Sequence, residues 1–394
     1  MTGLAERHLE MTLRNRVLFG VGEISRLPEV VAGAGGSRVF LVTDPGVFTA
    51  GIAGRAVEVL EAASIPVTMF SAVEPNPSGA TVERAAQDLR WLGLDGTLVV
   101  AVGGGSAMDA AKAIDLCAAN DRPVWELEYD GPDLVPGRPI VAIPTTAGTG
   151  SEAHPFAVIT REEIGRKDYI GHASLLPVTT ILDPELTVGL PPGVTAATGV
   201  DAMTHSLESL LSRNGNPFAE ATALGVIRTV HTWLARAIAD GSDIEARSQL
   251  LMASHLAGVG QASGTGVGLV HALGHSLGTR GRLAHGTALA VVLPEVLRFY
   301  AAETGLRDRE LALAGVALGA ASATEDPATG AGAAIGELRQ FLRSVGQRHR
   351  LRALGFDDAG LDVVAQDAID DVAIRNSPRL PTFDEARAIL ASVA

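Results

Sequence analysis

Short strand-like runs alternate with amphipathic helical stretches through the first half of this sequence, and this alternation restricts the fold more than any other feature. Runs such as GTLVVAVGGG (96–105) and RPIVAIPTTAG (138–148) are apolar, end in turn residues and have the length of buried strands. Between such runs, FTAGIAGRAVEVLEAAS (48–64) and SGATVERAAQDLRWLG (78–93) show helical period. Strand and helix repeated in this order predict an α/β domain with a parallel sheet, whose ligands bind at the carboxyl ends of the strands.

The pattern changes at LPPGVTAATGVD (190–201), where Pro191 and Pro192 break the chain. After this point strand-like runs nearly vanish, and stretches rich in Ala and Leu follow at helical spacing. We therefore predict an α/β domain over residues 1–188 and an all-helical domain over residues 189–394. The small-residue stretch GAASATEDPATGAGAA (319–334) is predicted to be an interhelical loop.

Composition and charge exclude several classes of protein. The 394 residues are 47% hydrophobic, enough for a sizeable core, and the net charge of −14 argues against a nucleic acid partner. The single cysteine, Cys117, excludes an intrachain disulfide and a thiolate metal cluster. The first ten residues are charged and no apolar run follows them, so we expect no signal peptide. The apolar runs are too short to cross a bilayer, and we expect a cytoplasmic protein without a membrane partner.

A glycine-rich loop follows one of the predicted strands. In VVAVGGGSAMDAAKAID, Gly104, Gly105 and Ser106 lead into a helix that carries Asp109. A helix N-terminus with bare N–H groups binds anions such as pyrophosphate. The usual dinucleotide fingerprint fails because Met108 stands at the third glycine position, so the loop alone indicates a phosphate site and leaves a plain tight turn as the alternative.

Polar residues follow two other predicted strands. Asp44 ends VFLVTDPG, while Thr145, Thr146 and Thr149 follow IVAIP. Because the carboxyl ends of parallel strands share one edge of the sheet, these groups are expected to meet the glycine loop in a cofactor cleft. For Asp44 the alternative is a turn former before Pro45.

Histidines are concentrated in GLVHALGHSLGTRGRLAHG (268–286), which holds three of the ten in the chain. His271 and His275 are four residues apart and share a helical face, as do Asp201 and His205 in the preceding half of the helical domain. With His285, these groups form a candidate metal site between facing helices. Nitrogen and oxygen donors without sulfur suit Fe²⁺ or Zn²⁺. The alternatives to a metal site are a proton relay and isolated core histidines.

The motifs GGGSAMDAAKAI, PTTAGTGSE, DPELTVGLPP, ATGVDAMTHSLES and HALGHSLGTRGRLAHG together resemble the iron-containing (group III) alcohol dehydrogenases, in the order and at the spacing of that family. The resemblance covers nearly the whole chain. It implies a dinucleotide-binding α/β domain and a helical metal domain, an architecture shared with dehydroquinate synthase, with catalysis in the cleft between them.

The resemblance also implies residue roles. Asp201, His205, His271 and His285 would bind Fe²⁺ or Zn²⁺, and His275 would lie near substrate and cofactor without binding the metal. The residues implied in cofactor binding are Asp44, Gly104, Gly105, Ser106, Asp109, Thr145, Thr146, Thr149 and Lys167. His275 is then a candidate proton relay, for which a cofactor ribose hydroxyl with water is the alternative. The charge of Asp44 would favour NAD(H) over NADP(H).

The substrate is the least constrained feature. A small alcohol or its aldehyde is the general expectation. His154 stands where the family pattern has Thr or Val, and Phe156 follows it. Arg280 and Arg282 replace residues that are apolar or aromatic in many members, and a guanidinium in the cleft would favour an anionic substrate group. The alternative is that both arginines face solvent.

Other functions remain on the same architecture: a polyol or glycerol dehydrogenase, a lyase of the dehydroquinate synthase type, and a metal-independent maleylacetate reductase-like enzyme. The Asp201, His205, His271 and His285 set argues against the last. A nucleotide-responsive binding protein with a structural metal is an alternative of a different class. We also expect a homodimer or a larger homo-oligomer.

Overall fold

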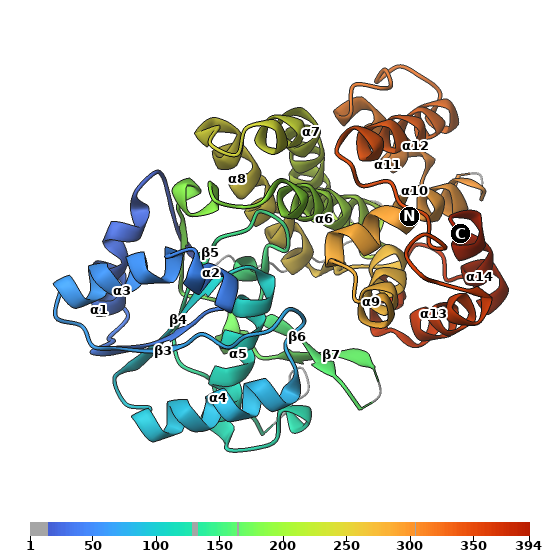
Figure 1. The fold of residues 1–394 in the computed structure, drawn as a ribbon. Coiled ribbons are helices and arrows are strands. Elements are labelled where there is room, and N and C mark those ends of the chain that lie inside the picture. Colours follow the sequence, from blue (N-terminus) through green and yellow to red (C-terminus); the bar gives the residue numbers. More distant parts are fainter. Residues whose placement is uncertain (1–14, 128–132, 164, 304) are drawn as a thin grey trace.

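The computed structural model describes residues 15–127, 133–163, 165–303 and 305–394, so the first ten residues, predicted to carry no signal peptide, lie outside it. Figure 1 shows the sheet with its helices as one lobe and the helices from α6 onward as a second. Six strands form one parallel sheet in the order β1-β8-β5-β4-β2-β3. The strands are β1 (Arg16–Phe19), β2 (Arg38–Val42), β3 (Val67–Phe70), β4 (Thr97–Gly103), β5 (Ile140–Pro144) and β8 (Thr179–Leu182).

Alternate side chains of the central strands enter two separate cores. Val99 and Ala101 of β4 pack with α4 (Gly79–Leu92) and α5 (Gly105–Asn120), whereas Val100 and Val102 pack with α1 (Leu27–Gly33) and α3 (Ile52–Ala62). Successive strand residues point to opposite faces, so helices cover both faces of the sheet. The predicted parallel α/β architecture is confirmed.

A two-stranded antiparallel hairpin lies between β5 and β8 in the chain and was not predicted. It consists of β6 (Phe156–Arg161) and β7 (Arg166–Gly171), with Val158 opposite Tyr169 and Thr160 opposite Lys167. Only two residues of β7 are buried, so its sequence lacks the apolar run that marks the other strands. The hairpin extends from the sheet lobe toward α9, and β7 contacts that helix (Figure 1).

After β8 the described chain is helical. Two short 3-10 turns, one π-helical turn and nine α-helices follow in the described residues: α6 (Pro192–Leu211), α7 (Pro217–Ala239), α8 (Ile244–Gly260), α9 (Leu269–Gly281), α10 (His285–Ala301), α11 (Asp308–Ala317), α12 (Pro327–Ser344), α13 (Asp358–Asp370) and α14 (Phe383–Ser392). This arrangement confirms the predicted helical second part. The predicted division at residue 188 lies between β8 and α6 and stays a prediction.

One helix boundary corrects the sequence analysis. The second half of 319–334, predicted to be a loop, belongs to α12, which begins at Pro327. Asp326 caps this helix by accepting a hydrogen bond from the Thr329 N–H at 3.1 Å, and proline is well tolerated in the first turn. The cap and the proline, rather than the Gly and Ala that follow, decide where this helix starts.

Helix α6 lies at the centre of the helical part, and nearly all its residues from Gly199 to Leu211 are buried. It packs against α7, α8 and α10. Its polar residues are therefore held inside the protein, where each needs a partner or a ligand. Within the described residues, no helix combines the length and the apolar content needed to cross a membrane.

Candidate metal and cofactor site

Three imidazoles, from helices α6, α9 and α10, converge on the Asp201 carboxylate of α6. Asp201 Oδ1 lies 3.6 Å from His205 Nε2, 3.7 Å from His271 Nε2 and 3.7 Å from His285 Nε2. Asp201, His271 and His285 can each offer a ligand atom within 4.8 Å of the others. His205 lies one turn along α6, and its ring stacks on that of His271 with centroids 4.5 Å apart. The i, i+4 spacing on α6 thus places both of its residues at the same point.

The polar atoms at the centre of this cluster lack protein partners. Asp201 Oδ1 and His271 Nε2 are buried and accept or donate no hydrogen bond within the described residues. Leaving such atoms unsatisfied in the interior costs about 1–3 kcal/mol each. A divalent cation among one carboxylate and three imidazoles would satisfy them, and this donor set is the one that iron and zinc accept.

The protonation states suit metal binding. Burial would raise the pKa of Asp201, but the neighbouring imidazoles hold that pKa well below its usual range. Burial lowers the pKa of His205 to about 4 and holds the pKa of His285 well below its usual value. At neutral pH the cluster therefore presents an ionised carboxylate and two neutral imidazoles, His205 and His285, in the state that binds a cation.

Glu208 orients the third imidazole, and sequence analysis missed it. Its Oε2 lies 2.5 Å from His271 Nδ1, and the carboxylate also accepts hydrogen bonds from the N–H groups of Gly268 and Val270 at the start of α9. Burial alone would lower the pKa of His271, but Glu208 and Asp201 raise it to about 9. The Glu208 carboxylate thus leaves Nε2 of His271 facing the cluster. The only sequence signal was its position seven residues after Asp201 on the same helix.

His275 lies beside the cluster. Its ring stacks near that of His285, with centroids 5.6 Å apart, and meets the ring of His271 edge-on at 5.9 Å. Its Nδ1 lies 2.8 Å from Asp371 Oδ2, a second carboxylate that sequence analysis missed. Burial lowers the pKa of His275, although Asp371 partly offsets this effect.

The glycine loop and the threonine segment pack closely at the carboxyl edge of the sheet. A Cβ added at Gly104 would lie 3.1 Å from Thr146 Cγ2, and one added at Gly105 would lie 2.5 Å from Thr149 Cγ2. Glycine is therefore needed at these positions for the two segments to meet. The first N–H groups of α5 lie at this junction, as predicted for a phosphate site.

The other predicted cofactor residues lie around this junction. Asp44 caps α2 (Pro45–Thr49), with Oδ1 accepting hydrogen bonds from the Gly46 and Val47 N–H groups, and its Oδ2 faces Gly103. Thr145 is buried, and its Oγ1 has no hydrogen-bond partner within the described residues. Ser106 Oγ accepts a hydrogen bond from the Asn76 N–H at 3.3 Å. Asn76, in the connection between β3 and α4, thus contacts the glycine loop, which sequence analysis overlooked.

Asp109 is engaged by the protein itself. Its Oδ1 accepts a hydrogen bond from Ser151 Oγ at 2.6 Å, and its Oδ2 accepts one from the Val158 N–H at 3.0 Å. Both carboxylate oxygens therefore hold neighbouring segments against α5. Asp109 therefore supports the cleft, and its direct contact with a cofactor stays a prediction.

Lys167 lies between the two halves of the site. Burial lowers its pKa, while the carboxylates of Asp109, Asp201 and Asp371 partly restore it. No hydrogen bond or ion pair of its ammonium group occurs within the described residues. Tyr169 lies two positions further along β7, on the same face of the hairpin, with its ring centroid 6.4 Å from that of His275. The unpredicted hairpin therefore brings side chains to the metal cluster.

The four candidate substrate residues separate into two groups. His154 and Phe156 stack with ring centroids 3.7 Å apart, and Phe156 lies 6.0 Å from the ring of Tyr169. Arg280 instead forms hydrogen bonds with Asp367 through Nε and Nη2, at 3.0 and 3.2 Å. Arg282 is exposed at the end of α9. The aromatic pair thus adjoins the site through Tyr169, whereas Arg280 is paired with Asp367 and Arg282 is exposed.

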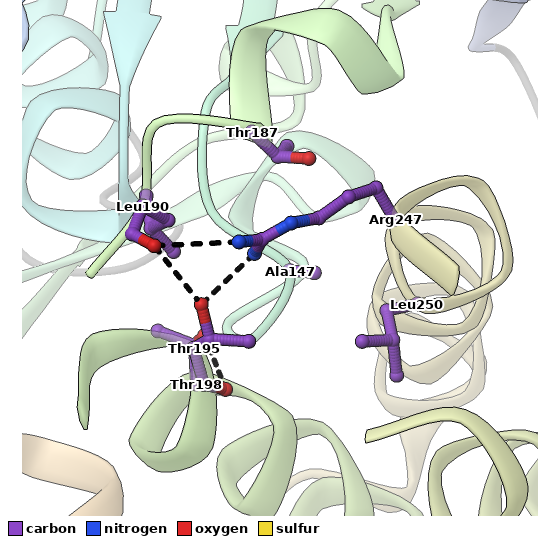
Figure 2. A pocket seen from close by; sticks show the side chains of 7 residues that line it. All are labelled: Ala147, Thr187, Leu190, Thr195, Thr198, Arg247 and Leu250. Atoms are coloured by element: carbon purple, nitrogen blue, oxygen red, sulfur yellow. Dashed lines mark hydrogen bonds between the residues drawn. The ribbon is translucent and has the colours of Figure 1, made fainter. Parts of the chain in front are cut away.

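Figure 2 shows a small enclosed cavity where the two lobes meet, lined by Ala147, Thr187, Leu190, Thr195, Thr198, Arg247 and Leu250. Its volume of about 10 Å³ is room for about one water molecule and not for a cofactor. The buried Arg247 guanidinium donates hydrogen bonds to Thr195 Oγ1 at 2.9 Å and to the Leu190 carbonyl at 3.3 Å. This arginine therefore braces the connection between the lobes.

A parallel α/β lobe with a glycine loop at a helix N-terminus, facing a helical lobe with an Asp and His cluster suited to a metal, is typical of metal-dependent oxidoreductases of the dinucleotide-binding type. The family model described as "Iron-containing alcohol dehydrogenase" matches residues 14–184, and "Fe-containing alcohol dehydrogenase family, C-terminal" matches residues 195–394. The chain belongs to the iron-containing alcohol dehydrogenase family.

Similar proteins span the whole chain. Alcohol dehydrogenase 4 of Schizosaccharomyces pombe is 35% identical over 377 residues, which are 95% of this chain and 86% of the relative. The NAD-dependent methanol dehydrogenase of Bacillus methanolicus is 31% identical, covering 95% of this chain and 96% of the relative. The crystal structure of a 1,3-propanediol oxidoreductase superposes with a TM-score of 0.93 at 32% identity, covering 98% of this chain and all of that one.

These findings confirm the family, the fold class and the reaction class predicted from the sequence. The protein is a metal-dependent alcohol dehydrogenase, an enzyme that transfers hydride between an alcohol or aldehyde and a nicotinamide cofactor. The family implies iron and NAD(H). The alternative of a non-enzymatic binding protein is therefore wrong.

Proposed function

We propose that this enzyme interconverts a small neutral alcohol and its aldehyde with NAD(H), using one divalent cation bound by Asp201, His205, His271 and His285. The observation that carries this proposal is the set of buried polar atoms without partners at the centre of that cluster. Iron(II) is the family's metal and our expected active form. Zinc binds nitrogen-rich sites more tightly than iron(II) does, and we expect it to compete.

The cofactor would lie along the carboxyl edge of the sheet. Pyrophosphate at the N-terminus of α5 would receive the N–H groups of Gly104, Gly105 and Ser106, with hydroxyls from Thr145, Thr146 and Thr149 nearby. Lys167 would contact the cofactor from the hairpin, and Asp109 would hold the loop in place. The Asp44 carboxylate would accept ribose hydroxyls and repel a 2′-phosphate, so we propose NAD(H) over NADP(H).

The reaction oxidises the alcohol by removing a hydride from carbon and a proton from oxygen. When bound, the metal supplies a Lewis acid for the substrate oxygen, and the nicotinamide ring supplies the hydride acceptor. His275 accepts the hydroxyl proton at Nε2, because Asp371 already occupies Nδ1. In aldehyde reduction the same imidazole returns the proton to oxygen.

The surroundings of the cluster favour a neutral substrate. Phe156 and Tyr169 form an aromatic wall beside His275, supported by the stacked ring of His154. Arg280 is paired with Asp367, and Arg282 is exposed at the end of α9, so neither predicted arginine is seen to offer its charge to a carboxylate in the site. Methanol and propanediol, named for two relatives, are alcohols of the proposed size.

The test follows NADH consumption at 340 nm over a panel of short aldehydes, each paired with an aldehyde acid of equal length. We expect turnover of neutral aldehydes, loss of activity on chelation, and recovery when Fe²⁺ is added without oxygen. NADPH should give a lower kcat/KM than NADH. Activity that survives complete metal removal, or a strong preference for the aldehyde acids, would overturn the proposal.

We also propose a cytoplasmic homodimer or larger homo-oligomer. The single cysteine is buried and reduced, as suits a reducing compartment. Light scattering after size exclusion would report the mass of the assembly, and a monomer at all concentrations would refute this part.

A further inference from the structure

We infer that Asp371 is the positioning residue for the proton relay: it fixes the orientation and the tautomer of His275 so that Nε2 faces the reacting oxygen. This inference rests on the proposed function, in which His275 accepts the substrate proton. Asp371 lies 96 residues after His275 in the sequence, at the end of α13.

The carboxylate is held at both oxygens. Asp371 Oδ2 lies 2.8 Å from His275 Nδ1, and Oδ1 accepts a hydrogen bond from the Ala373 N–H at 2.8 Å. That second bond caps a short 3-10 turn, Val372–Asn376. Both the imidazole and the carboxylate are buried, with side-chain exposures of 7% and 6%. Asp371 is therefore a fixed acceptor that does not swing away into solvent.

A fixed carboxylate determines where the imidazole proton lies. A carboxylate accepts hydrogen bonds, so Nδ1 of His275 carries the hydrogen and Nε2 keeps its lone pair. Carboxylates that hold an imidazole in one tautomer are worth large factors in rate where that imidazole is a general base. The ring faces His285 and Tyr169, which places Nε2 beside the metal cluster.

The site holds a second carboxylate–imidazole pair, and comparing the two pairs distinguishes metal binding from proton transfer. Glu208 binds Nδ1 of His271, whose Nε2 lies 3.7 Å from Asp201 Oδ1. Within the described residues, the ion pairs of Asp201 involve His205, His271 and His285 and not His275. One acid therefore orients a metal ligand, and the other orients an imidazole outside the ligand set. Changes at Asp371 should affect proton transfer and leave metal binding intact.

The chain offers a matched control on the same helix. Asp367 lies one turn before Asp371 on α13 and accepts hydrogen bonds from Ser276 Oγ at 2.6 Å and from Arg280 Nε at 3.0 Å on α9. It joins the same two helices without a bond to His275. Asp367→Asn thus weakens the contact between α13 and α9, as the Asp371 variants do, but does not change the hydrogen bond to His275.

The experiment compares Asp371→Asn, Asp371→Ser, Asp367→Asn and His275→Ala in the metal-loaded enzyme with NADH and a short neutral aldehyde. Asn and Ser both keep an oxygen that can cap the Ala373 N–H, so each variant retains the 3-10 turn. We expect kcat to fall about 10²-fold in both Asp371 variants. Metal content, NADH affinity and aldehyde KM should stay within about threefold of the original enzyme, and the solvent deuterium isotope effect on kcat should rise. Asp367→Asn should change kcat less than about threefold.

The outcomes separate this inference from the proposed function. Equal rates for Asp371→Asn and Asp367→Asn, or loss of metal from both Asp371 variants, would overturn the positioning role. If His275→Ala is slow while both Asp371 variants turn over normally, only this inference fails. A His275→Ala enzyme with full activity would instead remove the relay from the proposed function.

Discussion

At the scale of single residues, the site depends on which nitrogen of each imidazole is already bound. Glu208 takes Nδ1 of His271 and Asp371 takes Nδ1 of His275, so both rings present Nε2. Carboxylates behind metal-binding histidines orient the ring and strengthen its binding. The four ligands alone therefore do not account for the metal affinity of the site.

We predict that Glu208→Gln weakens binding of the metal by about 10- to 100-fold, because the oriented charge behind His271 is lost. Competition with a coloured chelator measures the affinity for Zn²⁺ or Fe²⁺. A matched control is Glu337→Gln, since Glu337 binds His231 Nε2 at 2.9 Å outside the site. Equal metal affinities of the two variants would refute the role of Glu208.

The clustering of the proposed ligands was predictable from the sequence, and the carboxylates that support them were not. Asp201 with His205 and His271 with His275 stand at helical spacing, so one pattern places each pair on one face. Glu208 is 63 residues before His271, and Asp371 is 96 residues after His275. Only the packing of α6, α9 and α13 brings these groups together, and no local pattern in one sequence reports it.

At the scale of elements, the hairpin β6–β7 connects the cofactor loop to the metal cluster. The buried Lys112 on α5 donates hydrogen bonds to Ser151 Oγ at 2.8 Å and to the carbonyls of Ser151 and Phe156, at 2.5 and 2.9 Å. Asp109 holds the same segment through Ser151 and Val158. Helix α5 therefore fixes the start of the hairpin, and through it Lys167 and Tyr169.

We predict that Lys112→Met destabilises the protein by about 2–4 kcal/mol at pH 7, because buried carbonyls lose a charged donor. Burial lowers the pKa of Lys112 from 10.5 to about 8 in the folded chain. Between these two values the unfolded chain holds a proton that the folded chain has released, so folding of the original protein becomes more favourable as pH rises. The stability difference between the original protein and the variant should widen from pH 8 to pH 10.

Urea unfolding at several pH values measures this difference. A gap that stays constant or narrows from pH 8 to pH 10 would contradict the lowered pKa of the buried Lys112 ammonium group. The hairpin itself escaped prediction because β7 has one half-buried face and charged residues at three of six positions, RKDYIG. Its place is set by α5 and α9 rather than by its own pattern.

At the scale of the whole molecule, the backbones of the two lobes approach each other closely at Gly150 and Gly258. Gly150, after the threonine segment, has a positive φ of 61°, and a Cβ added there would lie 2.7 Å from Gly258 Cα on α8. A Cβ added at Gly258 would overlap the Gly150 carbonyl oxygen. Arg247, on the same helix, braces the connection after β8 (Figure 2). Helix α8 of the helical lobe therefore supports the sheet lobe where the two lobes meet.

We predict that Gly258→Ala destabilises the protein by about 2 kcal/mol and raises KM for NADH, because the lobes must separate to admit the methyl group. Gly225→Ala is the control, since a Cβ there meets no atom within 4 Å and α7 should gain up to about 1 kcal/mol. Thermal unfolding and NADH titration measure both effects. Similar stabilities of the two variants would show that the lobes do not meet as closely as described.

The division into two lobes was predictable because the pattern of hydrophobic residues differs between the two halves of the sequence. Short apolar runs that end in turn residues precede residue 188, and runs with helical period follow it. The contact of Gly150 with Gly258 was not predictable, because glycine in a sequence does not say whether it serves a turn or a close approach.

The central claim is that Asp201, His205, His271 and His285 hold the metal while His275 moves the proton. Metal content per chain, measured alongside turnover in His271→Ala, His285→Ala and His275→Ala, tests it most directly. We predict that His271→Ala and His285→Ala lose both metal and activity, whereas His275→Ala keeps one ion per chain and turns over about 10²-fold more slowly. Full metal content with unchanged turnover in the first two variants, or loss of metal from His275→Ala, would contradict the account.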